Sequence, residues 1–271
     1  MTDANSSLPR NSTSPRPACL EIPPAPPHRP LRWRRALREL RALLDTPDDT
    51  EHAIDFMYAL GSRDYERNFQ RFASSAPGRA LLAERPSLLA ALSDREALAR
   101  MPDGSFGRAY LEYLERNGFE PGGLLPLQHR VQERWERDEG APKLDPMRNW
   151  FRDRSILAHD LFHVLTDYPT DDLGEATLLA FSLAQFGGRA QALLTLGAAL
   201  DCARSCGWRF LRYDFQAWQR GRRATSLVAL PWEDLLPLRL ATVRRLAGVA
   251  DADEAHPEGI LHGRIVARAT P

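Results

Sequence analysis

Helical spacing of apolar residues runs through most of the chain and constrains its fold more than any other feature. Apolar side chains recur three or four positions apart in successive sets, for example Leu88, Leu89 and Leu92, or Val131 and Trp135. Residues at this spacing share one face of a helix, whereas a strand requires strict alternation, which is scarce here. Glycine and proline pairs such as Pro77-Gly78 separate the sets and end helices. The sequence therefore predicts an all-α fold.

The length of the chain bounds its domain organisation. With 271 residues, of which 43% are hydrophobic, it can build one large core, so we expect a single multi-helix domain over residues 31–249. Residues 1–30 are rich in Pro, Ser, Asn and Thr, a composition typical of a disordered arm. Residues 250–271 show little apolar periodicity and are expected to form a weakly ordered tail.

Charge and cysteine content exclude several classes of protein. Lys+Arg and Asp+Glu both total 36, so no basic field indicates a nucleic-acid partner. Cys19, Cys202 and Cys206 cannot form a disulfide framework and lack C-x-x-C spacing, which favours a reducing compartment. No signal peptide or membrane-spanning apolar run is recognisable, although a transit peptide stays an alternative for the Ser-, Pro- and Arg-rich start. Lys143 is the only lysine, which indicates a GC-rich, bacterial source.

The segment from Leu31 to Leu44 has the pattern of a short basic amphipathic helix. Five arginines surround Trp33, Leu37, Leu40 and Leu44. One interpretation is that this helix binds an anionic membrane surface. The alternative is an ordinary packed helix with a solvated basic face.

Two consecutive helices are predicted in the middle of the chain. Asp145-Pro146 offers an N-cap and a first-turn proline for a helix that continues to about Thr166. A turn at residues 169–173 leads to a second helix, which begins near Asp172 or Leu173 and carries Glu175 in its first turn. Residues 190–200 either continue this helix or start another after Gly187-Gly188.

The candidate functional residues lie on these two helices. His159, Asp160 and His163 are three or four positions apart and can share one helix face, and a helix hairpin would return Glu175 to them. Two imidazoles with carboxylates suit a divalent metal, zinc above all, while iron and manganese accept the same ligands. The apolar neighbours support this interpretation, because an unpaired Asp-His cluster buried among them would be costly.

Other interpretations of the run His159-Asp160-Leu161-Phe162-His163 stay open. It could be a salt-bridged helix face without a metal. An HD-type metallophosphohydrolase also uses an adjacent His-Asp, with an upstream histidine such as His129, but the second histidine at 163 argues against it. Asp160 stands where the glutamate of an H-E-x-x-H metalloprotease would be, so that pattern fails.

The run from His159 to Thr166, followed by Leu173-Gly174-Glu175, resembles the HDxxH-x11-E signature of the coenzyme Q biosynthesis protein 4 family. Segments that also resemble the family occur in the same order, and the similarity extends from about Ala53 to Leu246. They are Gly107-Arg108-Ala109-Tyr110, Phe181-Ser182-Leu183-Ala184-Gln185-Phe186-Gly187 and Gly221-Arg222-Arg223-Ala224.

The resemblance implies a zinc-type site at His159, Asp160, His163 and Glu175 and a hydrophobic groove for a polyprenyl tail. Members of the family act in ubiquinone biosynthesis, at the inner membrane in mitochondria. Arg154 fits one of two arginines that the family places before the motif and is a candidate for substrate binding, whereas Ile156 occupies the place of the second. The closest cousins of this chain would then be bacterial proteins with another quinone or lipid as ligand.

Three functions are consistent with these features. The leading hypothesis is an enzyme that replaces the C1 carboxylate of a polyprenylated 4-hydroxybenzoate-derived precursor by a hydroxyl. The second is a non-catalytic lipid-binding scaffold that organises other ubiquinone biosynthesis proteins, and the third is the metallophosphohydrolase. Expected partners are a polyprenyl quinone precursor, other proteins of the pathway, a second copy of the chain and a membrane surface. The expected location is the bacterial cytoplasm beside the inner membrane, or the matrix side of the mitochondrial inner membrane.

Overall fold

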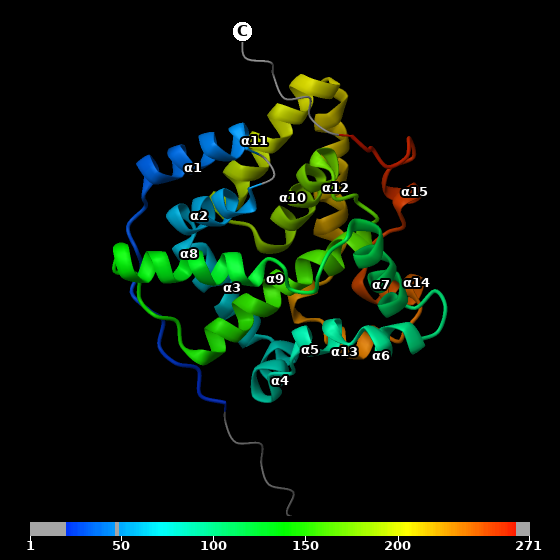
Figure 1. The fold of residues 1–271 in the computed structure, drawn as a ribbon, viewed down its shortest axis with the longest axis horizontal. Helices are drawn as coiled ribbons and strands as arrows, with labels where there is room; N and C mark the ends of the chain where they lie inside the picture. The colour runs from blue at the N-terminus through cyan, green and yellow to red at the C-terminus, as the bar shows by residue number, and fades with distance from the viewer. Residues whose placement is uncertain (1–19, 47–48, 264–271) are drawn as a thin grey trace, which may run out of the picture.

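The computed structural model describes residues 20–46 and 49–263. In this part of the chain all regular structure is helical, apart from a single antiparallel bridge between Ser105 and Arg239 (Figure 1). The all-α prediction is confirmed, and the helices pack into one domain. Residues 1–19 of the predicted arm and 264–271 of the predicted tail lie outside the described residues.

The helices have the following bounds. They are α1 (Trp33–Asp45), α2 (Thr50–Leu60), α3 (Ser62–Ser74), α4 (Ala76–Glu84), α5 (Leu88–Ser93), α6 (Arg95–Arg100), α7 (Phe106–Asn117), α8 (Leu125–Asp138), α9 (Pro146–Thr166), α10 (Asp172–Phe186), α11 (Arg189–Cys206), α12 (Arg209–Arg223), the 3-10 helix η1 (Leu227–Ala229), α13 (Trp232–Leu235), α14 (Leu240–Ala247) and α15 (Ala252–Ala255).

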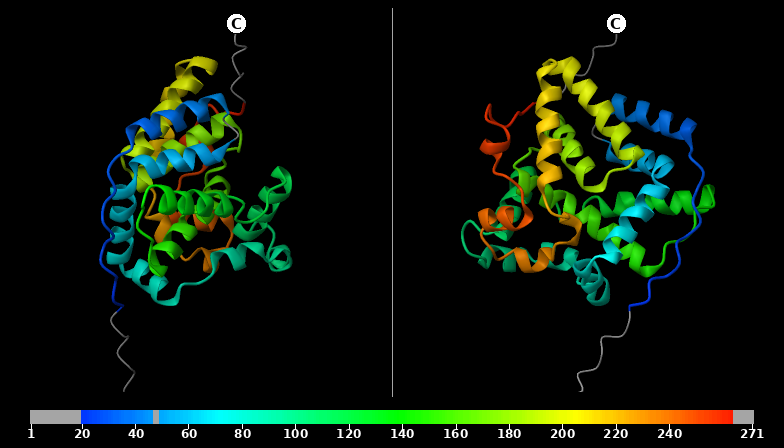
Figure 2. Two further views of the ribbon diagram at one scale, coloured as in Figure 1. Left: turned by 60° about the vertical axis from the view of Figure 1, so that its left-hand side comes forward. Right: turned by 180° about the vertical axis from the view of Figure 1, so that it is seen from behind.

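Helix α9 runs through the middle of the molecule and contacts α5, α7, α8 and α14 (Figures 1 and 2). It begins as predicted, with the carboxylate of Asp145 accepting hydrogen bonds from the backbone N–H groups of Met147 and Arg148. Its apolar side, including Leu161 and Phe162, lies in the largest hydrophobic cluster. The helix that carries the two candidate histidines is therefore fixed by the core on one side.

Helices α10, α11 and α12 follow one another and pack side by side. Gly187 and Gly188 both have positive φ, so the alanine-rich stretch starts the new helix α11 rather than continuing α10. A Cβ atom at Gly221 of α12 would lie 2.4 Å from the carbonyl oxygen of Phe181 in α10. Glycine at this position therefore allows the close approach of α12 to α10.

The basic helix α1 is held in place by a buried carboxylate. Asp55 of α2 accepts hydrogen bonds from Arg35 of α1, from Arg134 of α8 and from the indole N–H of Trp135.

Part of the proline-rich segment before α1 is also packed, although the sequence predicts a disordered arm there. Leu20 and Ile22 lie against a hydrophobic cluster. Apolar side chains inside the proline-rich segment account for this difference, because they bury surface that composition alone does not reveal.

Residues 250–263 lie against the α9–α10 turn, where the sequence predicts a weakly ordered tail. His256 is 1% exposed, and its Nε2 is hydrogen-bonded to the hydroxyl of Tyr168. Farther on, the backbone N–H of Gly263 donates to the carboxylate of Asp171. Within the described residues, no helix combines the length and the apolar character needed to cross a membrane.

Candidate metal centre

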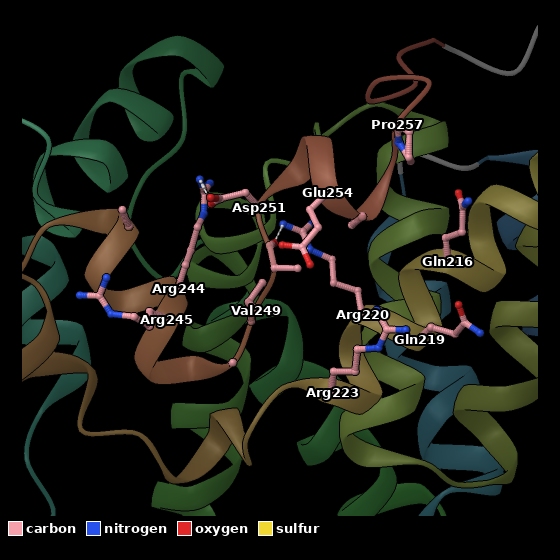
Figure 3. Close-up of a pocket in the computed structure, with 14 residues that line it drawn as sticks. Gln216, Gln219, Arg220, Arg223, Arg244, Arg245, Val249, Asp251, Glu254 and Pro257 are labelled. Atoms are coloured by element: carbon pink, nitrogen blue, oxygen red, sulfur yellow. Dashed lines mark hydrogen bonds and ion pairs between the residues drawn. The ribbon is translucent and has the colours of Figure 1, made fainter.

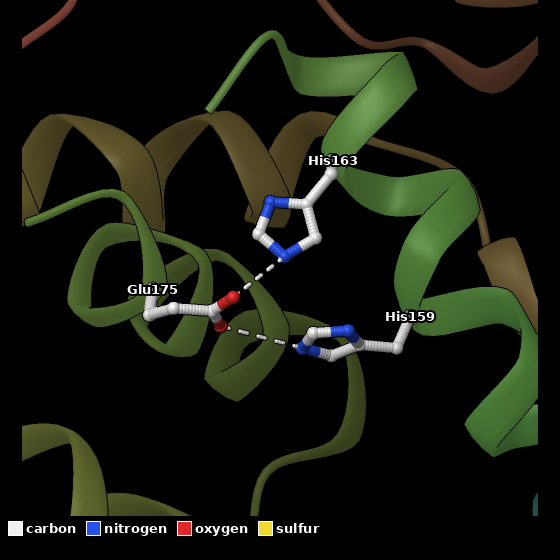
Figure 4. A group of neighbouring side chains, drawn as sticks. All are labelled: His159, His163 and Glu175. Carbon is white, nitrogen blue, oxygen red and sulfur yellow. Dashed lines mark ion pairs between the residues drawn. The ribbon is translucent and has the colours of Figure 1, made fainter. Parts of the chain in front are cut away.

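Two neighbouring helices bring three of the predicted ligands together. His159 and His163 lie one turn apart on α9, and Glu175 faces them from the first turn of α10 (Figure 4). Helix α9 ends where Asp167 adopts a left-handed conformation, and Asp171 then caps α10 by accepting from the backbone N–H of Gly174. The short connection between these two ends forms the predicted helix hairpin.

Gly174 sets how closely the two helices approach. A Cβ atom at this position would lie 2.1 Å from the carbonyl oxygen of Pro169, closer than any real side chain could come. The first turn of α10 therefore rests directly on the turn that follows α9. This contact brings Glu175, the next residue, to the histidines.

The distances between the candidate ligand atoms suit a small metal ion. The Nε2 atom of His163 is 3.1 Å from Oε1 of Glu175, and Nε2 of His159 is 3.6 Å from Oε2. Ligand atoms of a tetrahedral zinc site, with bonds of about 2.1 Å, lie about 3.4 Å apart. The ligand atoms of all three residues lie within 4.8 Å of one another. Small changes in the side-chain torsions would bring these atoms to the spacing of a tetrahedral site.

The orientation of His163 leaves one ring nitrogen ready to coordinate. Its Nδ1–H donates to the backbone carbonyl of Tyr168 at 2.9 Å, which leaves Nε2 as the ring nitrogen available to a metal ion. This Nε2 is buried and has no hydrogen-bond partner among the described residues, although Oε1 of Glu175 lies 3.1 Å away. A buried nitrogen without a hydrogen bond, opposite a carboxylate, is the arrangement that a cation would satisfy.

Charge around the site is arranged to keep Glu175 ionised. Partial burial opposes ionisation, but His163 and His159 outweigh it and hold the pKa of Glu175 well below its usual range. Burial likewise opposes protonation of His159, yet Asp160 and Glu175 raise its pKa to about 10. In the absence of a metal, a proton on His159 therefore compensates the carboxylates, and a metal ion would take over that role.

Asp160 does not join the group of three. Its Oδ1 lies 3.6 Å from Nδ1 of His159, the ring nitrogen that faces away from Glu175. A carboxylate in this place is suited to orient a metal-ligating histidine. The role of Asp160 as a ligand stays a prediction.

Arg154 and His129 are both engaged elsewhere. The guanidinium of Arg154 is buried, forms a bidentate ion pair with Glu233 and donates to the carbonyl of Leu230. Substrate binding by Arg154 stays a prediction, because it would require this pair to open. His129 lies on α8 and faces Asp153, outside the group of candidate ligands.

Aromatic residues of α7 form a wall beside the site. The sequence prediction of site residues did not include them. The ring of Tyr113 stacks on that of His163, with centroids 5.8 Å apart and an angle of 20° between the planes. Tyr110 is fully buried, and its hydroxyl has no hydrogen-bond partner among the described residues. Burial, and after it the charge of Asp160, raises the pKa of Tyr110 well above its usual range. The segment from Gly107 to Tyr110 carries part of the family resemblance, and that was the only sequence signal for this wall.

Comparisons with known proteins agree with these features. The sequence profile of the family described as "Coenzyme Q (ubiquinone) biosynthesis protein Coq4" matches residues 42–136 and 144–253. The chain is similar to the protein named "Ubiquinone biosynthesis protein COQ4, mitochondrial" from Coprinopsis cinerea, with 28% identity over 183 residues that cover 67% of this chain and 58% of that protein. The protein named "Ubiquinone biosynthesis protein COQ4 homolog, mitochondrial" from Xenopus tropicalis is 29% identical over 180 residues, covering 65% of this chain and 59% of its own length. The chain thus spans less than two thirds of the length of these relatives.

The fold is also found among solved structures. An example is the crystal structure of a protein from Nostoc punctiforme that is provisionally assigned to ubiquinone biosynthesis. It aligns with a TM-score of 0.55 and 19% sequence identity, covering 82% of this chain and all of the other. At this identity the similarity supports the helical architecture described above.

Proposed function

The chain belongs to the coenzyme Q (ubiquinone) biosynthesis protein Coq4 family, and from this premise we propose that it acts in ubiquinone biosynthesis through a metal centre. The observation that supports the proposal most directly is the convergence of His159, His163 and Glu175, the residues that carry the family-like signature. The third hypothesis, a metallophosphohydrolase, has no comparable support, because its candidate upstream ligand His129 faces Asp153 instead.

The residues present fit a divalent ion. Two imidazole nitrogens and a carboxylate are ligands that zinc, iron and manganese accept, and three protein ligands leave coordination positions for substrate. When bound, such an ion would supply Lewis acidity for the carboxylate and the adjacent oxygen of a ring substrate, to which iron or manganese would add redox chemistry. We propose His159, His163 and Glu175 as its ligands and Asp160 as a second carboxylate at the site.

The proposed reaction replaces the C1 carboxylate of a polyprenylated, 4-hydroxybenzoate-derived ring by a hydroxyl. The bond from C1 to the carboxyl carbon breaks and carbon dioxide leaves. One oxygen atom of dioxygen becomes the new hydroxyl and the other becomes water, with two electrons from an external reductant and protons from solvent. A polyprenyl tail would need an apolar groove, which stays a prediction.

The chain's own residues would position and shield this chemistry. The carbonyl of Tyr168 fixes the ring of His163 and its tautomer. The ring of Tyr113 covers His163 on one side and limits the access of water, which strengthens electrostatic interactions in the site. Glu175, 42% exposed, lies on the open side where a substrate head group could enter.

A turnover measurement tests the catalytic proposal. Protein loaded with zinc, iron or manganese is incubated with a carboxylated polyprenylphenol, dioxygen and a reductant, and release of carbon dioxide and the hydroxylated ring are measured. We expect turnover with at least one metal, its loss in His163→Ala, and its retention in His129→Ala, a histidine outside the site. Metal-loaded protein that binds the substrate without releasing carbon dioxide would leave only the scaffold function.

A separate observation on helix α1 supports the scaffold function. Trp33, Leu37 and Leu44 of α1 are about half exposed, and Arg34 and Arg41 lie exposed on the same helix. Exposed apolar side chains flanked by arginines are suited to an anionic lipid surface. We propose that α1 contacts the membrane on which the polyprenyl precursor and other proteins of the pathway would meet this chain.

A further inference from the structure

A cavity of about 700 Å³ lies between α12, α14 and residues 248–257 (Figure 3). This volume is in the range of small-molecule binding sites. Four arginines line it, together with the carboxylates of Asp251 and Glu254. They are Arg220, Arg223, Arg244 and Arg245. The proposed metal ligands are not among its lining residues.

Two of the four arginines have structural partners. Arg220 is 2% exposed, and its guanidinium donates to the carbonyl oxygens of Thr166 and Ala250. Arg244 donates to the carbonyl of Leu165 and forms ion pairs with Asp167 and Asp251. Both side chains thus satisfy carbonyl groups at the end of α9, which helix geometry leaves without partners.

The other two arginines have no carboxylate partner. The side chain of Arg223 of α12 is exposed and makes no hydrogen bond with any described residue, and the side chain of Arg245 of α14 has only a 3.5 Å contact with the hydroxyl of Thr242. Among the charged residues that line the cavity, Arg220, Arg223 and Arg245 have no ion-pair partner among the described residues, and Glu254 is the one carboxylate without such a partner. The cavity therefore holds an excess of positive charge.

We propose that this cavity binds the phosphate group of a small organic phosphate. Guanidinium groups recognise phosphate through paired N–H donors, and several around one cavity match a doubly charged group better than a single carboxylate. A nucleic-acid backbone would need a basic stripe along the surface rather than a cavity in a chain of zero net charge. The inference goes beyond the proposed function and does not depend on a metal at His163.

Titration calorimetry with inorganic pyrophosphate as the probe tests the site. We expect one saturable site in the full-length protein and a loss of affinity of at least about tenfold in Arg223→Gln/Arg245→Gln, because charge-assisted bonds to phosphate are lost. Neither side chain has an ion-pair partner, and Arg245 loses only the 3.5 Å contact with Thr242, so the variant should fold normally. Glu254→Gln should bind pyrophosphate more tightly, because it removes a repelling charge at the cavity.

A matched control separates the cavity from general electrostatic attraction. Arg204 and Arg212 are also exposed and outside the cavity, and Arg204→Gln/Arg212→Gln changes the net charge by the same amount. We expect its affinity for pyrophosphate to equal that of the unchanged protein. An equal loss in both double variants, or no saturable binding at all, would overturn the proposal, and equal metal content in all variants shows that the probe is not reporting on the metal centre.

Vesicles identify the source of the phosphate. If the cavity takes a lipid head group, vesicles of phosphatidate in phosphatidylcholine will bind in a manner that depends on Arg223 and Arg245, while soluble pyrophosphate competes for the site. If it takes a free phosphate, pyrophosphate will bind and the same variant will leave vesicle binding unchanged.

Discussion

The surroundings of His163 support the proposed metal centre more directly than those of any other residue. Its ring is fixed by the carbonyl of Tyr168, covered by Tyr113 and directed at Glu175. His159 has looser surroundings, with Asp160 beside one ring nitrogen and Glu175 beside the other. At the scale of single residues, the two histidines differ in how their orientation is secured.

Asp160 provides a prediction at this scale. If its carboxylate orients His159, Asp160→Asn should weaken metal binding about ten- to a hundredfold, the usual cost of losing such a partner. Competition with a chelator of known affinity measures the change. A loss of metal as complete as in His163→Ala would instead show that Asp160 coordinates the ion directly, as its place in the sequence motif predicts.

Asp214 of α12 predicts a pH dependence of stability. It is buried, one of its oxygens has no hydrogen bond in the described structure, and burial raises its pKa from 3.8 to about 8. Because the folded protein holds this proton more tightly than the unfolded chain, the contribution to stability is full below about pH 4 and is lost as pH rises to about 8. The loss is on the order of 5 kcal/mol.

Replacement of Asp214 by Asn should remove that loss. Urea unfolding at pH 5 and pH 8 should show a smaller decrease in the free energy of unfolding for Asp214→Asn than for the unchanged protein. Asp253→Asn, an exposed substitution of the same kind, serves as the control. Equal decreases in Asp214→Asn and in the unchanged protein would show that Asp214 is not a buried, protonated group.

The α9–α10 hairpin depends on Gly174 at the scale of elements. Gly174→Ala would push a Cβ atom against the carbonyl of Pro169, so the free energy of unfolding should fall by about 2–3 kcal/mol and metal affinity should fall with it. Thermal unfolding and chelator competition measure the two effects. Gly197→Ala in α11 meets only an ordinary contact and should be neutral or stabilising; similar results for both variants would contradict this account of the hairpin.

The helix α1 carries the proposed membrane contact. Replacing Trp33, Leu37 and Leu44 by Ser should strongly reduce cosedimentation with anionic liposomes, since exposed apolar side chains are lost. A triple variant of three comparably exposed residues elsewhere, Trp208, Phe215 and Leu246, should bind like the unchanged protein. A greater loss in this second variant would place the contact on another face.

Much of the hairpin could be predicted from the sequence because its signals are local. Asp145-Pro146 marks the start of α9, and the helical spacing of His159 and His163 needs no tertiary information. The carbonyl of Tyr168, the contact of Gly174 with Pro169 and the ring of Tyr113 could not be predicted in the same way. Each depends on how a turn folds back or on a helix distant in the sequence.

At the scale of the whole molecule, the ends of the chain differ most from the sequence prediction. His256 is buried among residues of α12 and beside Tyr168, although its segment shows little apolar periodicity. Arg220 joins the same region by donating to Ala250 and to the end of α9. Polar side chains with long-range partners hold this segment, and such partners are not visible in a periodic pattern.

The most direct test of the metal centre is elemental analysis combined with native mass spectrometry. The protein is purified without added metal, side by side with His163→Ala and with His129→Ala as the control, and thermal unfolding confirms that each is folded. We predict about one divalent ion per chain in the unchanged protein and in His129→Ala, and a sharp loss in His163→Ala. Undiminished metal in folded His163→Ala, or no metal in the unchanged protein even after incubation with zinc, iron or manganese, would contradict the proposed centre.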